Sequence, residues 1–127
     1  MKNIFHIEYV LGKISPSIIW KQIGSSAGLE YWFADRVDEN GNLFTFHWGK
    51  SSQTAKMLLC KSNSHIRFQW DDEEDKKSYF EMKLSTSEIS QDITLIITDF
   101  SESDEDLEEL TTWWNSKIES LQKMLGV

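Results

Sequence analysis

The feature that most constrains the fold is a long amphipathic helix predicted at the C-terminal end of the chain. Ser103 followed by Asp106 resembles a helix-capping box with Asp in place of Glu, and Gly126 is a typical helix stop. Between them, apolar side chains recur every three or four residues, at Leu107, Leu110, Trp114, Ile118, Leu121 and Leu125. This spacing gives one apolar face along about five helical turns. That face has to be covered by other elements.

Most of the preceding residues alternate between apolar and polar side chains, which is typical of strands with one buried face. Asn40-Gly41 predicts a tight hairpin turn, because both residues tolerate positive φ. In the strand at 54–61 we expect Ala55, Met57 and Leu59 to share one face. For the last strand both faces stay open, since Ile93, Leu95 and Ile97 compete with Ile96 and Phe100. The expected strands are 3–11, 35–39, 43–48, 54–61, 65–70, 79–84 and 93–100.

Two short helices are predicted between the first two strands. Ser15-Pro16 supplies an N-cap followed by proline at the first helical position, so one helix is expected over about Pro16–Ile23. Gly24-Ser25-Ser26 ends it, and a second is expected from Ala27 to Ala34. Helices and antiparallel strands in this order predict an α+β fold, in which a seven-stranded sheet wraps around the long C-terminal helix. Neither a linker nor a repeat is visible, so a single domain over 1–127 is expected.

The acidic residues are concentrated in two runs, 71–75 and 99–109. Together they hold 12 of the 21 acidic residues and leave 9 against 13 basic ones elsewhere. Dense acidic clusters oppose non-specific binding of nucleic acid. The first run is expected at a solvated hairpin tip, and the second in the first turn of the C-terminal helix, where carboxylates suit the helix dipole. The alternative is a docking surface for a basic protein partner, with Asp72, Glu74, Glu105 and Glu108 as candidates.

Cysteine usage and hydropathy predict the compartment. The single Cys60 cannot form an internal disulfide, which fits a reducing environment. No apolar stretch approaches the roughly 18 residues of a membrane span, and residues 1–11 lack the shape of a signal peptide. We therefore expect a cytoplasmic protein without a membrane span.

No motif for catalysis, a metal or a cofactor stands out. Cys60 is expected on the strand face opposite Met57 and Leu59, with no electropositive surroundings to activate it. His6, His47 and His65 are expected on the outer face, and their spacing does not suit a metal site. The chain also lacks a glycine-rich phosphate loop. We therefore predict no catalytic residue, no cofactor and no metal.

Several segments resemble the START-like, or helix-grip, superfamily over essentially the whole chain. They are Ser15-Pro16 with Trp20, Gly28-Leu29-Glu30-Tyr31-Trp32-Phe33-Ala34-Asp35, Phe44-Thr45-Phe46-His47-Trp48, Ile66-Arg67-Phe68-Gln69-Trp70 and Thr94-Leu95-Ile96-Ile97-Thr98-Asp99-Phe100. The sequence looks closest to the homologues of the chaperone-ATPase activator and to short bacterial START-like proteins. Full-length activators carry an additional N-terminal domain that is not seen in this sequence, so direct ATPase activation is not expected.

The resemblance implies a cavity between the sheet and the long helix. Asp99 would lie at its mouth with a raised pKa if it shares a face with Ile93, Leu95 and Ile97, or it would cap the following turn. The alternative for the aromatic rings is that they simply fill the core. The candidate lining residues are Trp32, Phe44, Phe46, Trp48, Phe68, Trp70, Phe80, Asp99 and Trp114.

Two further residues have alternative roles. Arg67 is expected to face outward and pair with an acid such as Glu81, but on the opposite face it would anchor an acidic ligand. Trp113, off the main apolar stripe, would mark a dimer contact or close the cavity rim. The oligomeric state is open.

Three functions follow from the resemblance and the charge pattern. The first is a module that binds a small hydrophobic molecule in the cavity. The second is a protein-interaction or co-chaperone-like module that uses the acidic surfaces. The third is a cavity enzyme, such as a cyclase or hydrolase, which would depend on Asp99.

Overall fold

The computed structural model describes residues 2–127. Its elements follow the predicted order of one strand, two short helices, six strands and one long helix. Their bounds are β1 (Asn3–Gly12), α1 (Pro16–Ile23), α2 (Ser26–Leu29), β2 (Arg36–Asn40), β3 (Leu43–Trp48), β4 (Ser51–Lys61), β5 (His65–Trp70), β6 (Phe80–Thr86), β7 (Ile93–Ser101) and α3 (Asp104–Leu125).

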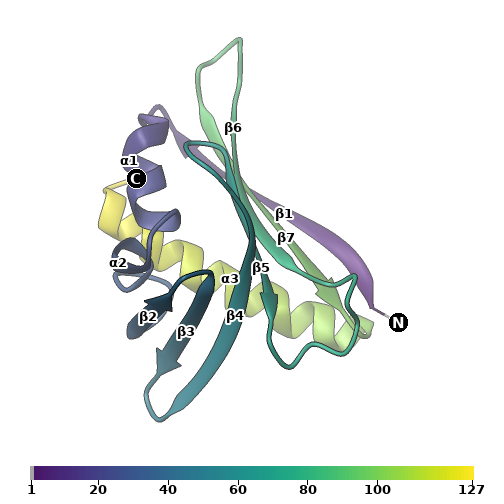
Figure 1. Ribbon diagram of the computed structural model, residues 1–127. Coiled ribbons are helices and arrows are strands. Elements are labelled where there is room, and N and C mark those ends of the chain that lie inside the picture. Colours follow the sequence, from purple (N-terminus) through teal and green to yellow (C-terminus); the bar gives the residue numbers. More distant parts are fainter. Residues whose placement is uncertain (1) are drawn as a thin grey trace.

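The strands form one antiparallel sheet in the order β1-β7-β6-β5-β4-β3-β2. The sheet is strongly curved, and α3 crosses one of its faces (Figure 1). The start of β1 and the beginning of α3 lie at one end of the molecule in this view, and α1 lies at the other. The predicted α+β class, with a seven-stranded sheet around the C-terminal helix, is confirmed.

The buried face of β7 is the one that carries Ile93, Leu95 and Ile97, which are almost fully buried. Ile96 is only half-buried, and the Phe100 ring packs on Tyr79 with centroids 5.0 Å apart on the outer side. The alternation of the strand therefore puts Asp99 on the same inner face as Ile97. This resolves the ambiguity that the sequence left open.

The caps of α3 match the predicted signals. Ser103 Oγ accepts a hydrogen bond from the Asp106 amide at 3.1 Å, and Asp106 Oδ2 accepts one from the Glu102 amide at 2.8 Å. The carboxylate thus bonds to the residue before the N-cap, not to the N-cap amide of a standard capping box. Gly126 ends the helix at φ 76°, in the left-handed region that glycine favours.

The two short helices differ partly from expectation. α1 has the predicted bounds, but the Ser15 side chain makes no capping bond and pairs with Ser17 Oγ at 2.9 Å. The second helix, expected from Ala27 to Ala34, covers only Ser26–Leu29. The amides of Phe33 and Ala34 both donate to the Leu29 carbonyl, at 2.9 and 3.2 Å, which closes the helix.

Strand β4 starts at Ser51, three residues earlier than expected, and contains a bulge between Met57 and Leu59. A bulge inserts one unpaired residue and reverses the alternation after it. The expectation for Leu59 is therefore wrong: it pairs with Arg67 and is 45% exposed. Cys60 pairs with Ile66 and shares its face, so its predicted orientation opposite Met57 is also wrong.

Candidate functional site

Most aromatic rings between the sheet and α3 form a packed core. Phe33 is fully buried at its centre, with ring centroids of Phe46, Trp113 and Trp114 at 5.0, 5.4 and 5.8 Å. Edge-to-face contacts of this kind add to the burial energy of the rings. The core therefore holds no large chamber at its middle, and open space lies toward the N-terminal end of α3.

One hollow, which we name the aromatic pocket, has a volume of about 420 Å³. It falls within the usual size range of ligand sites, which starts near 300 Å³. Its walls come from β3, β4, β5, β6, β7 and the first half of α3. The lining residues are Trp48, Gln53, Trp70, Phe80, Asp99, Asp106, Glu109, Leu110, Trp113 and Trp114.

The register of β3 and β4 explains why space is left there. Phe44, Phe46 and Trp48 face inward on β3, and their direct partners on β4 are Ala55, Gln53 and Ser51. Directly opposite residues lie about 5 Å apart and share a face. Because small or polar side chains stand beside the large rings, β4 does not fill the volume next to Trp48 and Trp70.

The indole groups of the pocket are held by hydrogen bonds or by packing. Trp48 Nε1 donates to the Phe33 carbonyl at 2.8 Å, and Trp114 Nε1 donates to Asp99 Oδ2 at 2.9 Å. Ring centroids of Trp48 and Trp113 are 6.1 Å apart, and those of Trp48 and Trp70 are 6.3 Å apart. These contacts fix three walls of the pocket in position.

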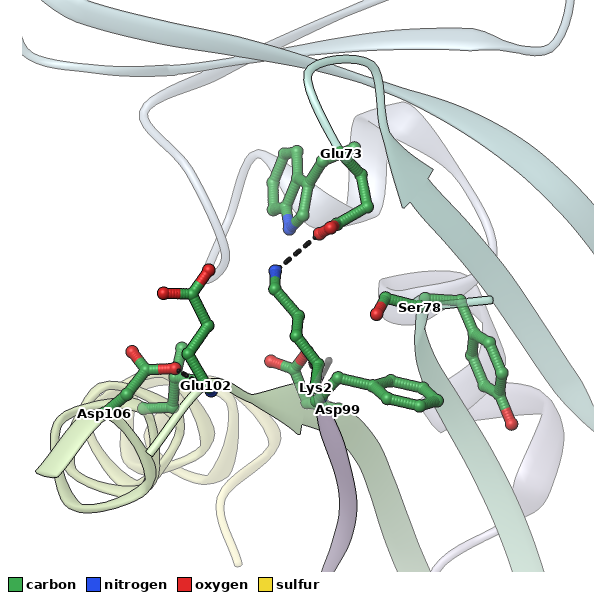
Figure 2. Close-up of a pocket in the computed structure, with 10 residues that line it drawn as sticks. Lys2, Glu73, Ser78, Asp99, Glu102 and Asp106 are labelled. Carbon is green, nitrogen blue, oxygen red and sulfur yellow. Dashed lines mark hydrogen bonds and ion pairs between the residues drawn. The ribbon is translucent and has the colours of Figure 1, made fainter. Parts of the chain in front are cut away.

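A second hollow of about 240 Å³, the polar pocket, adjoins the first and shares Trp70, Asp99, Asp106 and Leu110 with it. Figure 2 shows the Lys2 side chain reaching across it toward Glu73, with Glu102 and Asp106 on one side and Ser78 on the other. Lys2 Nζ lies 2.6 Å from Glu73 Oε2. Although burial opposes the charge on Lys2, this hydrogen bond and the nearby carboxylates raise its pKa.

Asp99 lies where the two pockets meet. Burial raises the pKa of its carboxyl to about 6, against the opposing effects of the Trp114 indole, the Phe100 amide and the Lys2 charge. A buried carboxyl with a shifted pKa in a cleft is a typical feature of functional sites. The sequence-based expectation of a raised pKa agrees with this position at the cavity.

The structure distributes the predicted cavity residues between two environments. Trp48, Trp70, Phe80, Asp99 and Trp114 line the aromatic pocket. Trp32, Phe44, Phe46 and Phe68 line neither hollow and belong to the packed core, which also includes Phe80 and Trp114, each 1% exposed. Both alternatives of the sequence analysis thus apply, to two overlapping sets of rings.

Several pocket residues were absent from the predicted set. Trp113 had been considered as a rim residue, and it lines the aromatic pocket while packing on Phe33. Glu109 and Leu110 also had a usable signal, since they lie within one turn of Trp113 on the same helix. Lys2, Gln53 and Ser78 had none, because their positions depend on strand register and on the path of the β5–β6 loop.

The acidic candidates Asp72, Glu74, Glu105 and Glu108 are all exposed. The first run is not a purely solvated hairpin tip, because the Glu73 side chain is largely buried and paired with Lys2. Asp72, Glu74 and Glu102 line one depression of about 420 Å³, so the two acidic runs meet at the Lys2 end of the molecule.

Arg67 follows the outward alternative. It pairs with Glu81 across β5 and β6, with Nε 2.8 Å from Oε2, and its guanidinium lies 4.0 Å from the Tyr79 ring centroid. Glu81 is a buried acid and Arg67 satisfies it, which favours a structural role for the pair.

Residues 2–127 give little support for a reactive cysteine, a metal site or a membrane-spanning helix. Burial raises the pKa of the Cys60 thiol, which disfavours the nucleophilic thiolate. Three or more His, Cys, Asp or Glu side chains placed to hold a metal ion are not found within this range. None of the helices in the same range has the length and apolar character needed to cross a membrane.

The fold and the hollow first define a class: an α+β helix-grip protein with a ligand-sized space between a curved sheet and a long helix. The family model described as the START-like superfamily domain matches residues 1–127, so the chain belongs to the START-like superfamily. The resemblance drawn from the sequence motifs is therefore confirmed. A search of curated proteins found no match.

Similar solved structures cover nearly the whole chain. The protein BfR322 from Bacteroides fragilis is 39% identical, with a TM-score of 0.68 over 98% of this chain and 91% of that one. The Aha1 dimer from Colwellia psychrerythraea is 16% identical, with a TM-score of 0.76 and coverage of 94% and 93%. DynU16, a putative protein in the dynemicin biosynthetic locus, is 12% identical with a TM-score of 0.80, over 98% of this chain and 47% of that one. The last two likenesses concern the fold alone.

Proposed function

We propose that the protein binds a small, largely apolar molecule in the aromatic pocket between the sheet and α3. The observation that carries the proposal is a hollow of about 420 Å³ walled by Trp48, Trp70, Phe80 and Trp113, with Asp99 as a polar group at one end. Ligand sites typically combine apolar walls with a few fixed polar groups. The START-like fold is compatible with such a role but does not specify the ligand.

The first experiment is native mass spectrometry of freshly purified protein, followed by solvent extraction and identification of what is released. A discrete adduct that disappears on denaturation is expected. Absence of an adduct together with failure of the binding test below would contradict the proposal.

The binding test uses prodan, an uncharged dye whose emission shifts to the blue in apolar surroundings. Leu110→Trp should fill the pocket and remove the shift, because Leu110 lines both hollows. Leu125→Trp is the matched control, since Leu125 lies at the far end of α3 and lines neither. Equal prodan binding by both variants would place the dye elsewhere and count against the pocket.

The second candidate is a protein-interaction module that uses the acidic end of the molecule. It is favoured by the meeting of the two acidic runs, with Asp72 and Glu74 exposed beside Glu102. Charge complementarity mainly accelerates association and depends on salt. Asp72→Lys combined with Glu74→Lys should abolish capture of a basic partner at low salt, and unchanged capture would exclude these residues.

A further inference from the structure

The charged side chains that line the aromatic pocket are all negative among residues 2–127. Asp99, Asp106 and Glu109 line it, and among residues 2–127 no Lys, Arg or His does so. An anionic ligand would meet three carboxylates without a counter-charge, in a place where partial burial strengthens electrostatic interactions. The pocket therefore disfavours acids such as fatty acids or bile-acid-like molecules.

The adjoining polar pocket does not compensate for this charge. Among the residues that the structure describes, Lys2 is its single lining cation, against Glu73, Asp99, Glu102 and Asp106. The Lys2 ammonium is already bound to Glu73 at 2.6 Å. Negative charge is therefore left in excess around Asp99.

The polar end also presents hydrogen-bond acceptors with capacity to spare. Asp99 Oδ2 accepts from Trp114 Nε1 and Oδ1 accepts from the Phe100 amide, whereas a carboxylate offers about four lone-pair sites. Both bonds come from the protein, so the remaining sites on Asp99 are available to a donor in the pocket.

Ser78 provides an independent sign of a missing partner. It is only 3% exposed, its Oγ has no hydrogen-bond partner among residues 2–127, and it points into the polar pocket in Figure 2. After the Lys77 and Lys2 amides, the hydroxyl contributes to the lowered pKa of the Asp75 carboxyl, although the two do not reach hydrogen-bond geometry. Buried polar groups left unpaired are rare and call for a partner.

The walls next to Asp99 suit a cation as well. Trp48, Trp70, Trp113 and Trp114 surround the hollow, and the electron-rich faces of indoles attract cations within about 6 Å. Trp113 already has a cation at that range on its own helix, since Lys117 Nζ lies 5.7 Å from the ring centroid.

We propose that the ligand of this pocket is an organic cation, in which a protonated amine on an aromatic or apolar body pairs with Asp99 while the body lies against the tryptophan walls. This proposal rests on the proposed function and adds the charge class of the ligand. The ammonium supplies a donor to the lone-pair sites of Asp99 that the protein leaves free, and its charge offsets the excess of carboxylates.

The test compares three probes with the same phenyl body: 2-phenylethylamine, 2-phenylethanol and 3-phenylpropanoate, which are cationic, neutral and anionic at pH 7.5. Binding is followed by indole N–H chemical shifts and by tryptophan fluorescence excited at 295 nm, which the probes do not absorb. The amine should bind at least about tenfold more tightly than the alcohol, as expected for a charge-assisted hydrogen bond. The acid should bind most weakly.

Variants test which residues cause the tighter binding of the amine. Asp99→Asn should remove the tenfold advantage of the amine over the alcohol, and Glu109→Gln, at an exposed position, should reduce it by a smaller factor. Asp92→Asn is the control with the same change in charge, because Asp92 lies in the β6–β7 turn and lines neither pocket. Equal binding of amine and alcohol, or tighter binding of the acid, would overturn the cation proposal and leave the apolar pocket standing. Failure of all three probes would overturn the cation proposal, and only failure of the adduct and prodan tests as well would overturn the proposed function.

Discussion

At the scale of single residues, Asp99 lies in the candidate site, and its buried carboxylate lowers the stability of the fold at neutral pH. Its carboxyl is largely buried and receives only two protein donors, Trp114 Nε1 and the Phe100 amide. Lys2 stabilises its charged form, while Asp106 on α3 opposes it. A folded-state pKa of about 6, above the unfolded value near 4, means that folding takes up a proton between these pH values. The contribution of Asp99 to stability therefore falls as the pH rises from about 4 to about 6.

Asp99→Asn should consequently raise the free energy of unfolding at pH 7.5 by about 2 kcal/mol, and this gain should vanish near pH 4, where the native carboxyl is also neutral. Urea unfolding at both pH values measures the difference, with Asp92→Asn as the charge-matched control. A loss of stability that is the same at both pH values would show that the carboxylate is structurally required.

Gly28 must be glycine because the backbone of α1 packs directly against it, although its φ angle is one that any residue can adopt. A Cβ at this position would lie 2.0 Å from the Lys21 carbonyl oxygen and 2.6 Å from Gln22 Cα, so α1 and α2 would have to separate. Gly28→Ala should lower the free energy of unfolding by about 1–3 kcal/mol, as overpacking does. Gly12→Ala is the informative comparison, because a Cβ there meets nothing within 4 Å and its cost comes only from φ 93°. Equal stability of Gly28→Ala and the native protein in thermal unfolding would contradict the close packing.

At the scale of elements, the bulge in β4 determines which side chains reach the core. Leu59 pairs with Arg67 on the outer face, whereas Ile66, opposite Cys60, is fully buried. Leu59→Thr should therefore change the free energy of unfolding by less than about 0.5 kcal/mol. Ile66→Thr should lower it by more than about 2 kcal/mol, since it loses buried apolar surface and buries a hydroxyl. Similar losses for both, measured by urea unfolding, would indicate that β4 keeps strict alternation.

The same element shows where sequence reasoning reaches its limit. Period-two and helical patterns depend on local sequence, and they correctly predicted seven strands, α1, α3 and the Arg67–Glu81 pair. The bulge has no local signal, because Leu58 and Leu59 are both apolar and the pairing with β5 decides which one is skipped. The early end of α2 likewise depends on Trp32, whose indole donates to the Gln22 carbonyl at 2.7 Å and holds the chain against α1.

The candidate site was predictable only in part for the same reason. The inward faces of β3 and β5 could be read from alternation, which suggested Trp48 and Trp70. For β7 alternation left both faces open, so Asp99 was expected at the cavity only if it shared a face with Ile97. Which rings pack and which line open space depends on the residues across the strand, such as Gln53 opposite Phe46. That register involves two strands at once, and it becomes visible only in three dimensions.

At the scale of the whole molecule, Lys2 and the β5–β6 loop meet at the polar pocket, although 71 positions separate Lys2 from Glu73. The pair restrains the open end of the sheet and reduces the negative charge there. Glu73 is only 9% exposed at its side chain, so removing its partner would leave a poorly solvated carboxylate.

Lys2→Gln separates the restraint on the sheet from the reduction of negative charge. Loss of the restraint should lower stability, whereas loss of the positive charge should strengthen the binding of a cation. The free energy of unfolding should fall by about 1–2 kcal/mol, the loss expected for a partly buried ion pair. Binding of 2-phenylethylamine should nevertheless tighten, since the positive charge that competes with the ligand for the carboxylates is gone. Urea unfolding and probe titration at low salt measure the two changes.

Lys123→Gln, which removes an exposed pair with Glu119, should alter neither stability nor binding. If binding weakens in proportion to stability, Lys2 acts by holding the pocket in shape, and the excess negative charge around Asp99 does not govern which ligands bind.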